Sequence, residues 1–151
     1  MSRIYARKCV FIMVYEKVFA EKYKLNILNF FDEENKEPLQ DIYKEIGLED
    51  SESQEYCENF VKNIISQKTT LEDIIKSKLT RFPIEKILST DLAILLCSVY
   101  ELLYDKSTSV KVIVNEAVKL AKTYSDDNSY KFVNGVLSSI IKDIDSGKYT
   151  I

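Results

Sequence analysis

The chain has 151 residues, of which 46% are hydrophobic and 30% are charged, and its formal net charge is -3. This length suits one compact domain, and this composition is ordinary for a soluble globular protein. Three glycines and two prolines are too few for a turn-rich all-β chain, so long helices are favoured. No apolar run is long enough to span a bilayer, and no signal-peptide pattern opens the sequence. We therefore expect an all-α cytoplasmic domain without a membrane contact.

The absence of histidine limits the chemistry that the chain can perform. It removes the commonest general base, the commonest metal ligand and every Ser-His or Cys-His nucleophile pair. The sequence also contains no glycine-rich phosphate loop. Cys9, Cys57 and Cys97 are far apart and fall on apolar helix faces, so we expect three reduced core thiols. We expect no enzyme, no metal site and no cofactor.

Charge is distributed unevenly along the chain. Residues 1–24 carry six basic and two acidic side chains, whereas residues 32–58 carry eleven acidic and two basic ones. The remaining residues, 59–151, are slightly basic. The N-terminal segment is therefore suited to a polyanion and the acidic block is not. A plain solvated surface is the alternative interpretation of the same asymmetry.

In the N-terminal part, the spacing of apolar residues predicts a helix over about residues 3–22. Residues 25–37 read as a loop or a ragged helix end. Pro38 suits the start of a short second helix, and Gly47 suits its C-terminal cap. Ser51 opens a capping-box pattern, which predicts the start of a third helix.

In the C-terminal part, a fourth helix is expected to start near Thr70, and Pro83 then forces a break. Residues 89–104 are apolar almost all round and should form the central, most buried helix. Asp91 lies near the start of this helix, where it suits the helix dipole, and we expect it to be exposed. The tail from Asp145 onward has no pattern and is expected to be frayed.

Two amphipathic helical patterns, 110–124 and 130–144, follow, and the polar joint between them, residues 125–129, offers side chains able to cap the second helix. Two asparagines sit inside these apolar runs, and an interior glycine costs about 1 kcal/mol relative to alanine. We interpret them as architectural residues that hydrogen-bond across the helix pair, with the glycine permitting close approach. This architectural set is Asn115, Glu116, Asn134 and Gly135.

About seven helices are expected in all, with no confident strand, internal repeat or low-complexity linker. Thr69 is the natural division of the chain. We therefore predict a single domain over residues 1–151, with an N-terminal three-helix part over 1–68 and a C-terminal helical part over 69–151.

The most specific segment is VKVIVNEAVKLAKTYSDDNSYKFVNGVL, residues 110–137, which resembles the C-terminal signature of the NusB family of transcription antitermination factors. Three further segments agree in the same order: SRIYARKCVFIMVY, LEDIIKSKL and LTRFPIEKILSTDLAILLCSVYELLY. The resemblance covers nearly the whole chain except about 25–55, and it implies an all-α fold of two packed helical bundles.

The resemblance also implies a function. Proteins of this family bind the boxA element of RNA jointly with a ribosomal small-subunit protein, NusE. The complex joins other Nus factors on RNA polymerase, so that ribosomal RNA operons are transcribed without premature termination. One alternative is a helical interaction module, as a homodimer or a ribosomal-protein binder, with little RNA binding of its own. A second alternative is an accessory domain of an RNA methyltransferase. This alternative is weaker, because the sequence has no room for a methyl-donor fold.

The resemblance carries two groups of binding residues onto this sequence. The RNA-binding group combines cations for phosphates with one aromatic ring for base stacking: Arg3, Arg7, Lys8, Lys111, Lys131 and Phe132. The ribosomal-protein group includes acids, which suit a basic partner: Tyr15, Asp91, Asp127 and Asn128.

Three basic positions of the family pattern are apolar in this chain: Ile4, Leu92 and Leu96. Each lost phosphate contact reduces both the affinity and its salt dependence. RNA binding is therefore expected to be weaker than usual or to be carried more by the partner. Alternatively, Leu92 and Leu96 add apolar surface for a partner or a homodimer.

Overall fold

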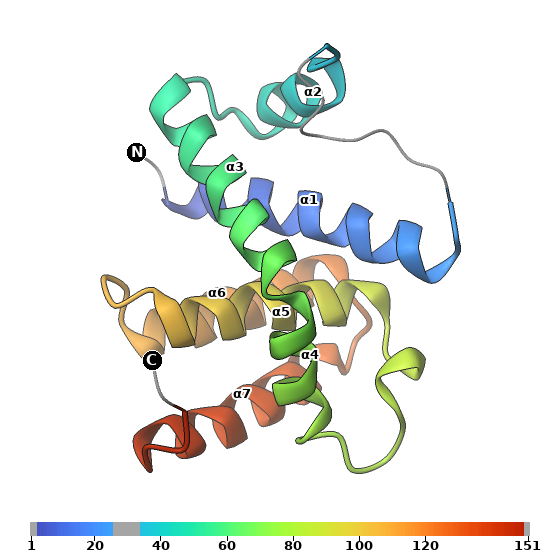
Figure 1. Cartoon of the computed structure of the whole chain (residues 1–151), viewed down its shortest axis with the longest axis vertical. Helices are drawn as coiled ribbons and strands as arrows, with labels where there is room; N and C mark the ends of the chain where they lie inside the picture. Colours follow the sequence, from blue (N-terminus) through green and yellow to red (C-terminus); the bar gives the residue numbers. More distant parts are fainter. Residues whose placement is uncertain (1–2, 26–33, 150–151) are drawn as a thin grey trace. The chain divides into compact units, whose positions relative to one another are not determined.

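The computed structural model describes residues 3–25 and 34–149. Within these residues the regular secondary structure consists of seven α-helices and one short 3-10 helix, without a strand, which confirms the all-α prediction. The chain divides into two compact units, residues 1–66 and 67–151 (Figure 1). No helix in the described ranges is both long enough and apolar enough to cross a membrane.

The first unit contains three helices, and α1 packs against the other two. They are α1 (Arg3–Lys22), α2 (Glu37–Ile46) and α3 (Ser51–Ser66). Most of the predicted loop over 25–37 lies outside the described residues. Gly47 ends α2 in the left-handed conformation (φ 90°), and its N–H donates to the Tyr43 carbonyl at 2.8 Å, as predicted for a glycine cap. Asp50, rather than the predicted Ser51, caps α3, because its Oδ2 accepts from the Ser53 N–H at 2.9 Å.

The second unit is built around α5, which contacts α4, α6 and α7. Its elements are α4 (Lys68–Lys76), the 3-10 helix η1 (Ile84–Lys86), α5 (Ser89–Tyr104), α6 (Val110–Tyr124) and α7 (Ser129–Asp145). The prediction of a largely buried central helix is confirmed, since apolar side chains are buried around α5: Ala93, Ile94, Leu95, Leu96, Val99, Leu102 and Leu103. The fourth helix begins at Lys68, slightly before the predicted Thr70.

The prediction of a frayed tail is wrong for the described residues after α7. Gly147 adopts the left-handed region (φ 79°), which turns the chain back toward the last helical turn. Lys148 Nζ and the Tyr149 hydroxyl then both lie 3.4 Å from Asp143 Oδ2. These contacts hold the segment after α7 against the helix end.

The cysteine prediction is confirmed at two of its three positions. Cys9 and Cys57 are buried, and burial raises their thiol pKa values to about 11 and about 12. The Cys57 thiol lies 3.6 Å from the Ala6 carbonyl, which it contacts as a donor. Cys97 is a free cysteine with a partly exposed surface, and burial raises the pKa of its thiol as well.

The architectural interpretation of the C-terminal helix pair is wrong. Asn115 and Asn134 are exposed, and Glu116 pairs with Lys119 of its own helix at 3.3 Å. A Cβ atom added at Gly135 meets nothing within 4 Å, so this glycine permits no close approach. The buried side chains of α6 and α7 are apolar or small instead: Ile113, Ala117, Ala121, Ser129, Val133, Val136, Leu137 and Ile140.

Candidate functional site

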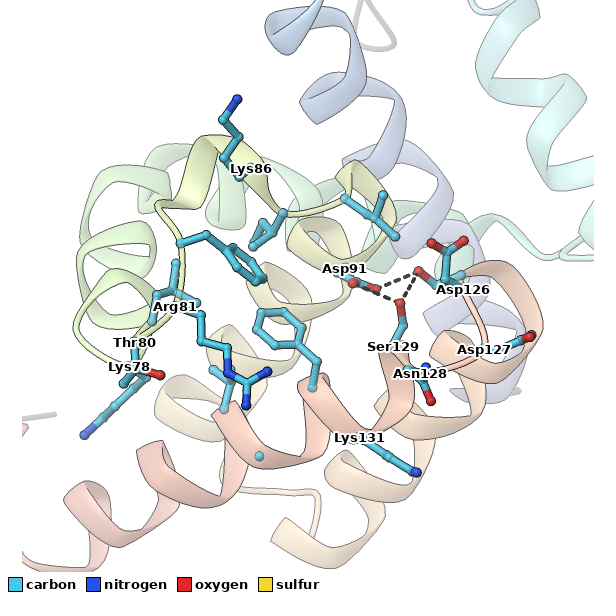
Figure 2. A pocket seen from close by; sticks show the side chains of 18 residues that line it. Lys78, Thr80, Arg81, Lys86, Asp91, Asp126, Asp127, Asn128, Ser129 and Lys131 are labelled. Carbon is cyan, nitrogen blue, oxygen red and sulfur yellow. Dashed lines mark hydrogen bonds between the residues drawn. The ribbon is translucent and has the colours of Figure 1, made fainter.

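A groove of about 1120 Å³ lies within the second unit. Its walls come from three parts of that unit: the loop after α4 with the end of η1, the start of α5, and the joint with the first turns of α7 (Figure 2). The lining residues are 78–82, 86–88, Asp91, 125–129, Lys131, Phe132, Gly135 and Val136. The groove therefore brings together segments that are far apart in the sequence.

The groove separates charges of opposite sign. Lys78 and Arg81 lie on one side, whereas Asp126 and Asp127 lie on the joint at the other side (Figure 2). Lys131 adds a further cation from α7. One side therefore suits an anion such as a phosphate, and the other suits a cationic group.

Two phenylalanine rings belong to the same groove. The ring centroids of Phe82 and Phe132 are 6.1 Å apart, with 32° between the ring planes. Phe82 is 43% exposed, so part of its ring is available to a ligand. Nucleic-acid bases stack on such rings, whereas cations beside them hold the phosphates.

Asp91 is buried, with 5% of its surface exposed, so the prediction of an exposed acid is wrong. Its Oδ1 accepts a hydrogen bond from the Ser125 hydroxyl at 2.7 Å, and its Oδ2 accepts one from Ser129 at 3.0 Å. Burial raises the pKa of Asp91, while the two serine hydrogen bonds oppose this shift and the nearby Asp126 adds to it. The carboxylate faces the joint rather than open solvent.

Lys78 is fixed at the edge of the groove by an ion pair with Asp143 of α7. The hydrogen bond from Lys78 lowers the pKa of Asp143, and the positive charge of Lys148 acts in the same direction. This pair joins the loop after α4 to α7 and fixes the position of the Lys78 ammonium group.

The groove brings together six of the predicted site residues: Asp91, Asp127, Asn128, Lys131, Phe132 and Gly135. Lys111, Asn115, Glu116 and Asn134 also belong to the second unit but do not line the groove. The side chain of Asn128 makes no cap hydrogen bond with α7, contrary to the expected capping by the joint.

The remaining predicted residues lie on α1 of the first unit. Arg3 is exposed, whereas Arg7 and Lys8 are partly buried at the start of the helix. Tyr15 belongs to a row of rings with Phe11 and Phe19, at centroid distances of 6.2 and 5.8 Å. The three predicted cations therefore precede this row of rings along α1.

The three apolar residues at positions that are basic in the family pattern differ in their exposure. Ile4 is 53% exposed and Leu92 is partly buried. Leu96 is fully buried, so the alternative in which it adds apolar surface for a partner is wrong.

The sequence did not lead us to predict the part of the groove lining that precedes α5 in the chain. Its lining residues include Lys78, Arg81, Phe82 and Lys86. The signal was present, because basic residues alternate with an aromatic residue in the short connection KLTRFPIEK. The contact between this connection and α7, however, follows from tertiary packing that periodicity does not reveal.

Known proteins resemble this chain over most of its length. The model of the NusB family matches residues 5–142. The transcription antitermination protein NusB of Bacillus pumilus is 42% identical over 98 residues, which are 65% of this chain and 75% of that protein.

Solved structures support the same relationship. The NusB structure of T. maritima has a TM-score of 0.75 and 27% identity, over 95% of this chain and 92% of that one. A crystal structure of the antitermination factors NusB and NusE in complex with dsRNA has a TM-score of 0.71 and 26% identity, over 93% and 96% of the two chains. The resemblance inferred from the sequence segments is thereby confirmed.

Proposed function

The chain belongs to the NusB family, and we propose that it acts as a transcription antitermination factor by binding boxA-type RNA together with the ribosomal protein NusE. The complex would join other Nus factors on RNA polymerase and promote processive transcription of ribosomal RNA operons. The role is one of binding rather than catalysis, without a cofactor, and it is exercised in the cytoplasm.

The groove of the second unit is the observation that carries this proposal. Arg81 and Lys131 supply cations for RNA phosphates, while the ring of Phe132 lies beside that of Phe82 and offers a stacking surface. The joint with Asp127 supplies negative charge that suits a basic ribosomal protein. A surface with both features fits a protein that holds RNA and a basic protein at the same time.

Further contacts are proposed outside the groove. Arg3, Arg7 and Lys8 on α1 are proposed as additional phosphate contacts, and Lys111 on α6 as another. Tyr15 and Asn128 are proposed as contacts with the ribosomal protein.

Fluorescence anisotropy with a labelled boxA-type RNA tests the proposal. The affinity is measured at several salt concentrations, with and without NusE, and against an RNA of scrambled sequence. We expect NusE to increase the affinity for boxA-type RNA more than for the scrambled RNA. The absence of any RNA binding at low salt, even with NusE present, would contradict the proposal.

A pair of variants connects this measurement to the groove. Arg81→Ala removes a groove cation, and each lost phosphate contact lowers the slope of log affinity against log salt by about 0.7 for a single strand. Lys142→Ala removes an exposed cation of α7 outside the groove lining and serves as the matched control. Full NusE binding with no effect of RNA would instead favour a protein-interaction module.

A further inference from the structure

One carboxylate joins the end of α6 to the start of α7. Asp91 comes from the first turn of α5 and accepts hydrogen bonds from both Ser125 and Ser129 (Figure 2). The two serine oxygens are 2.9 Å apart, and the Thr90 hydroxyl lies 2.8 Å from that of Ser125. We call Thr90, Asp91, Ser125 and Ser129 the clasp.

The clasp lies where the chain changes direction. Ser125 ends α6 in an extended conformation, and the Ser129 N–H donates to the Asp126 carbonyl at 3.0 Å to close the turn. The side chain of Asn128, which precedes α7, supplies no cap hydrogen bond. The hydroxyl of Ser129, the first residue of α7, is bound by Asp91 instead.

We propose that Asp91 is a positioning residue, which acts through Ser125 and Ser129 to hold the joint and the first turn of α7 in their binding geometry. Lys131 and Phe132 follow directly after the clasp and line the groove. Their placement therefore depends on a carboxylate that is buried and held by the two serines. The consequence for binding rests on the proposed function, and it replaces the direct partner contact expected for Asp91.

The chemistry of the clasp distinguishes a positioning role from a direct ionic contact. An Asp91→Asn side chain has nearly the same shape, and its carbonyl oxygen accepts from one serine while its amide donates to the oxygen of the other. An Asp91→Ala side chain makes neither bond. A salt bridge to a cation of the partner would need the negative charge, which both variants lack.

The test measures the affinity of the full chain for boxA-type RNA in the presence of NusE. We expect Asp91→Asn to bind within about twofold of the unmodified chain, whereas Asp91→Ala and the double variant Ser125→Ala/Ser129→Ala each bind about tenfold more weakly. Combining Asp91→Ala with the two serine changes should add little further loss, because all three act through the same bonds. Ser138→Ala, an exposed serine of α7, is the matched control.

Amide hydrogen exchange provides a readout that does not depend on binding. Exchange over residues 125–132 should accelerate in Asp91→Ala and stay close to normal in Asp91→Asn. If Asp91→Ala does not fold, Ser125→Ala removes one of the two bonds to Asp91. Its exchange over residues 125–132 is then compared with that of Asp91→Asn.

Three outcomes would overturn the proposal: equal loss of affinity in Asp91→Asn and Asp91→Ala, unchanged affinity in Asp91→Ala, or unchanged exchange at the joint. Failure of the unmodified chain to bind RNA and NusE would refute the proposed function, while the exchange experiment would still decide whether the clasp holds the joint.

Discussion

Phe82 and Phe132 lie with their ring centroids 6.1 Å apart in the groove of the second unit, although they come from distant parts of the sequence. Phe82 belongs to the connection before η1, and Phe132 belongs to the first turns of α7. The contact places an aromatic surface in the same groove as several cations, and the proposed RNA binding depends on this combination.

Replacing Phe132 by alanine should weaken RNA binding by about 1–3 kcal/mol, which is the typical contribution of one stacked base. Phe132→Leu keeps much of the apolar volume but removes the ring, so it should lose most of the same affinity. Anisotropy titrations with boxA-type RNA measure both variants, and thermal unfolding shows whether they remain folded. Unchanged affinity in folded Phe132→Ala would exclude a stacking role.

The ion pair between Lys78 and Asp143 predicts an acid-sensitive part of the stability. The pKa of Asp143 is lowered in the folded chain below its ordinary value of 3.8, so its contribution is present above that value and is lost as the pH falls through the folded pKa. Asp143→Asn should therefore be less stable than the unmodified chain at neutral pH, and this difference should shrink in acid. Thermal unfolding across pH measures it, with exposed Asp145→Asn as the control.

Asp91 predicts the opposite pH dependence. Burial raises its pKa in the folded chain above 3.8, so its contribution to stability is complete below that value and is lost as the pH rises through the folded pKa. Asp91→Asn does not titrate, and we expect it to be at least as stable as the unmodified chain at neutral pH. Denaturant unfolding should show that this advantage disappears in acid; an advantage that grew on acidification would contradict the assignment.

Gly135 is predicted to be a dispensable glycine. It lies on the exposed face of α7, and an added Cβ meets nothing within 4 Å. Gly135→Ala should therefore raise the free energy of unfolding by about 0.5–1 kcal/mol, because alanine favours the helix. Gly47→Ala should destabilise the chain instead, since Gly47 has a φ of 90°. Denaturant unfolding measures both, and a destabilised Gly135→Ala would mean that the glycine is needed for packing.

The helical architecture was predictable because each helix carries a local signal. The apolar spacing over 110–124 and the glycine cap at Gly47 both depend on neighbouring residues, and both agree with the structure. The family was predictable for a related reason, since its signature is contiguous. The capping residues were less predictable, because Asp50 caps α3 where the sequence pattern predicted Ser51.

The groove and the clasp were only partly predictable because they depend on contacts between distant segments. In the sequence, Asp91 has the pattern of an exposed acid at a helix start. In the folded unit, Ser125 and Ser129 donate hydrogen bonds to it. Asn115 and Gly135 seemed structural because their sequence neighbours are apolar, yet both are exposed in the folded unit. Periodicity identifies the buried face of a helix, but it does not identify which partner covers a polar residue.

The central claim is that the groove of the second unit binds RNA, and amide chemical-shift mapping of the ¹⁵N-labelled chain tests it most directly. Adding boxA-type RNA should shift the signals of Arg81, Phe82, Lys131 and Phe132 most strongly in this unit, with little change at exposed Thr69 and Thr70 of α4. Strong shifts confined to α6, with the groove signals unchanged at saturating RNA, would contradict the account.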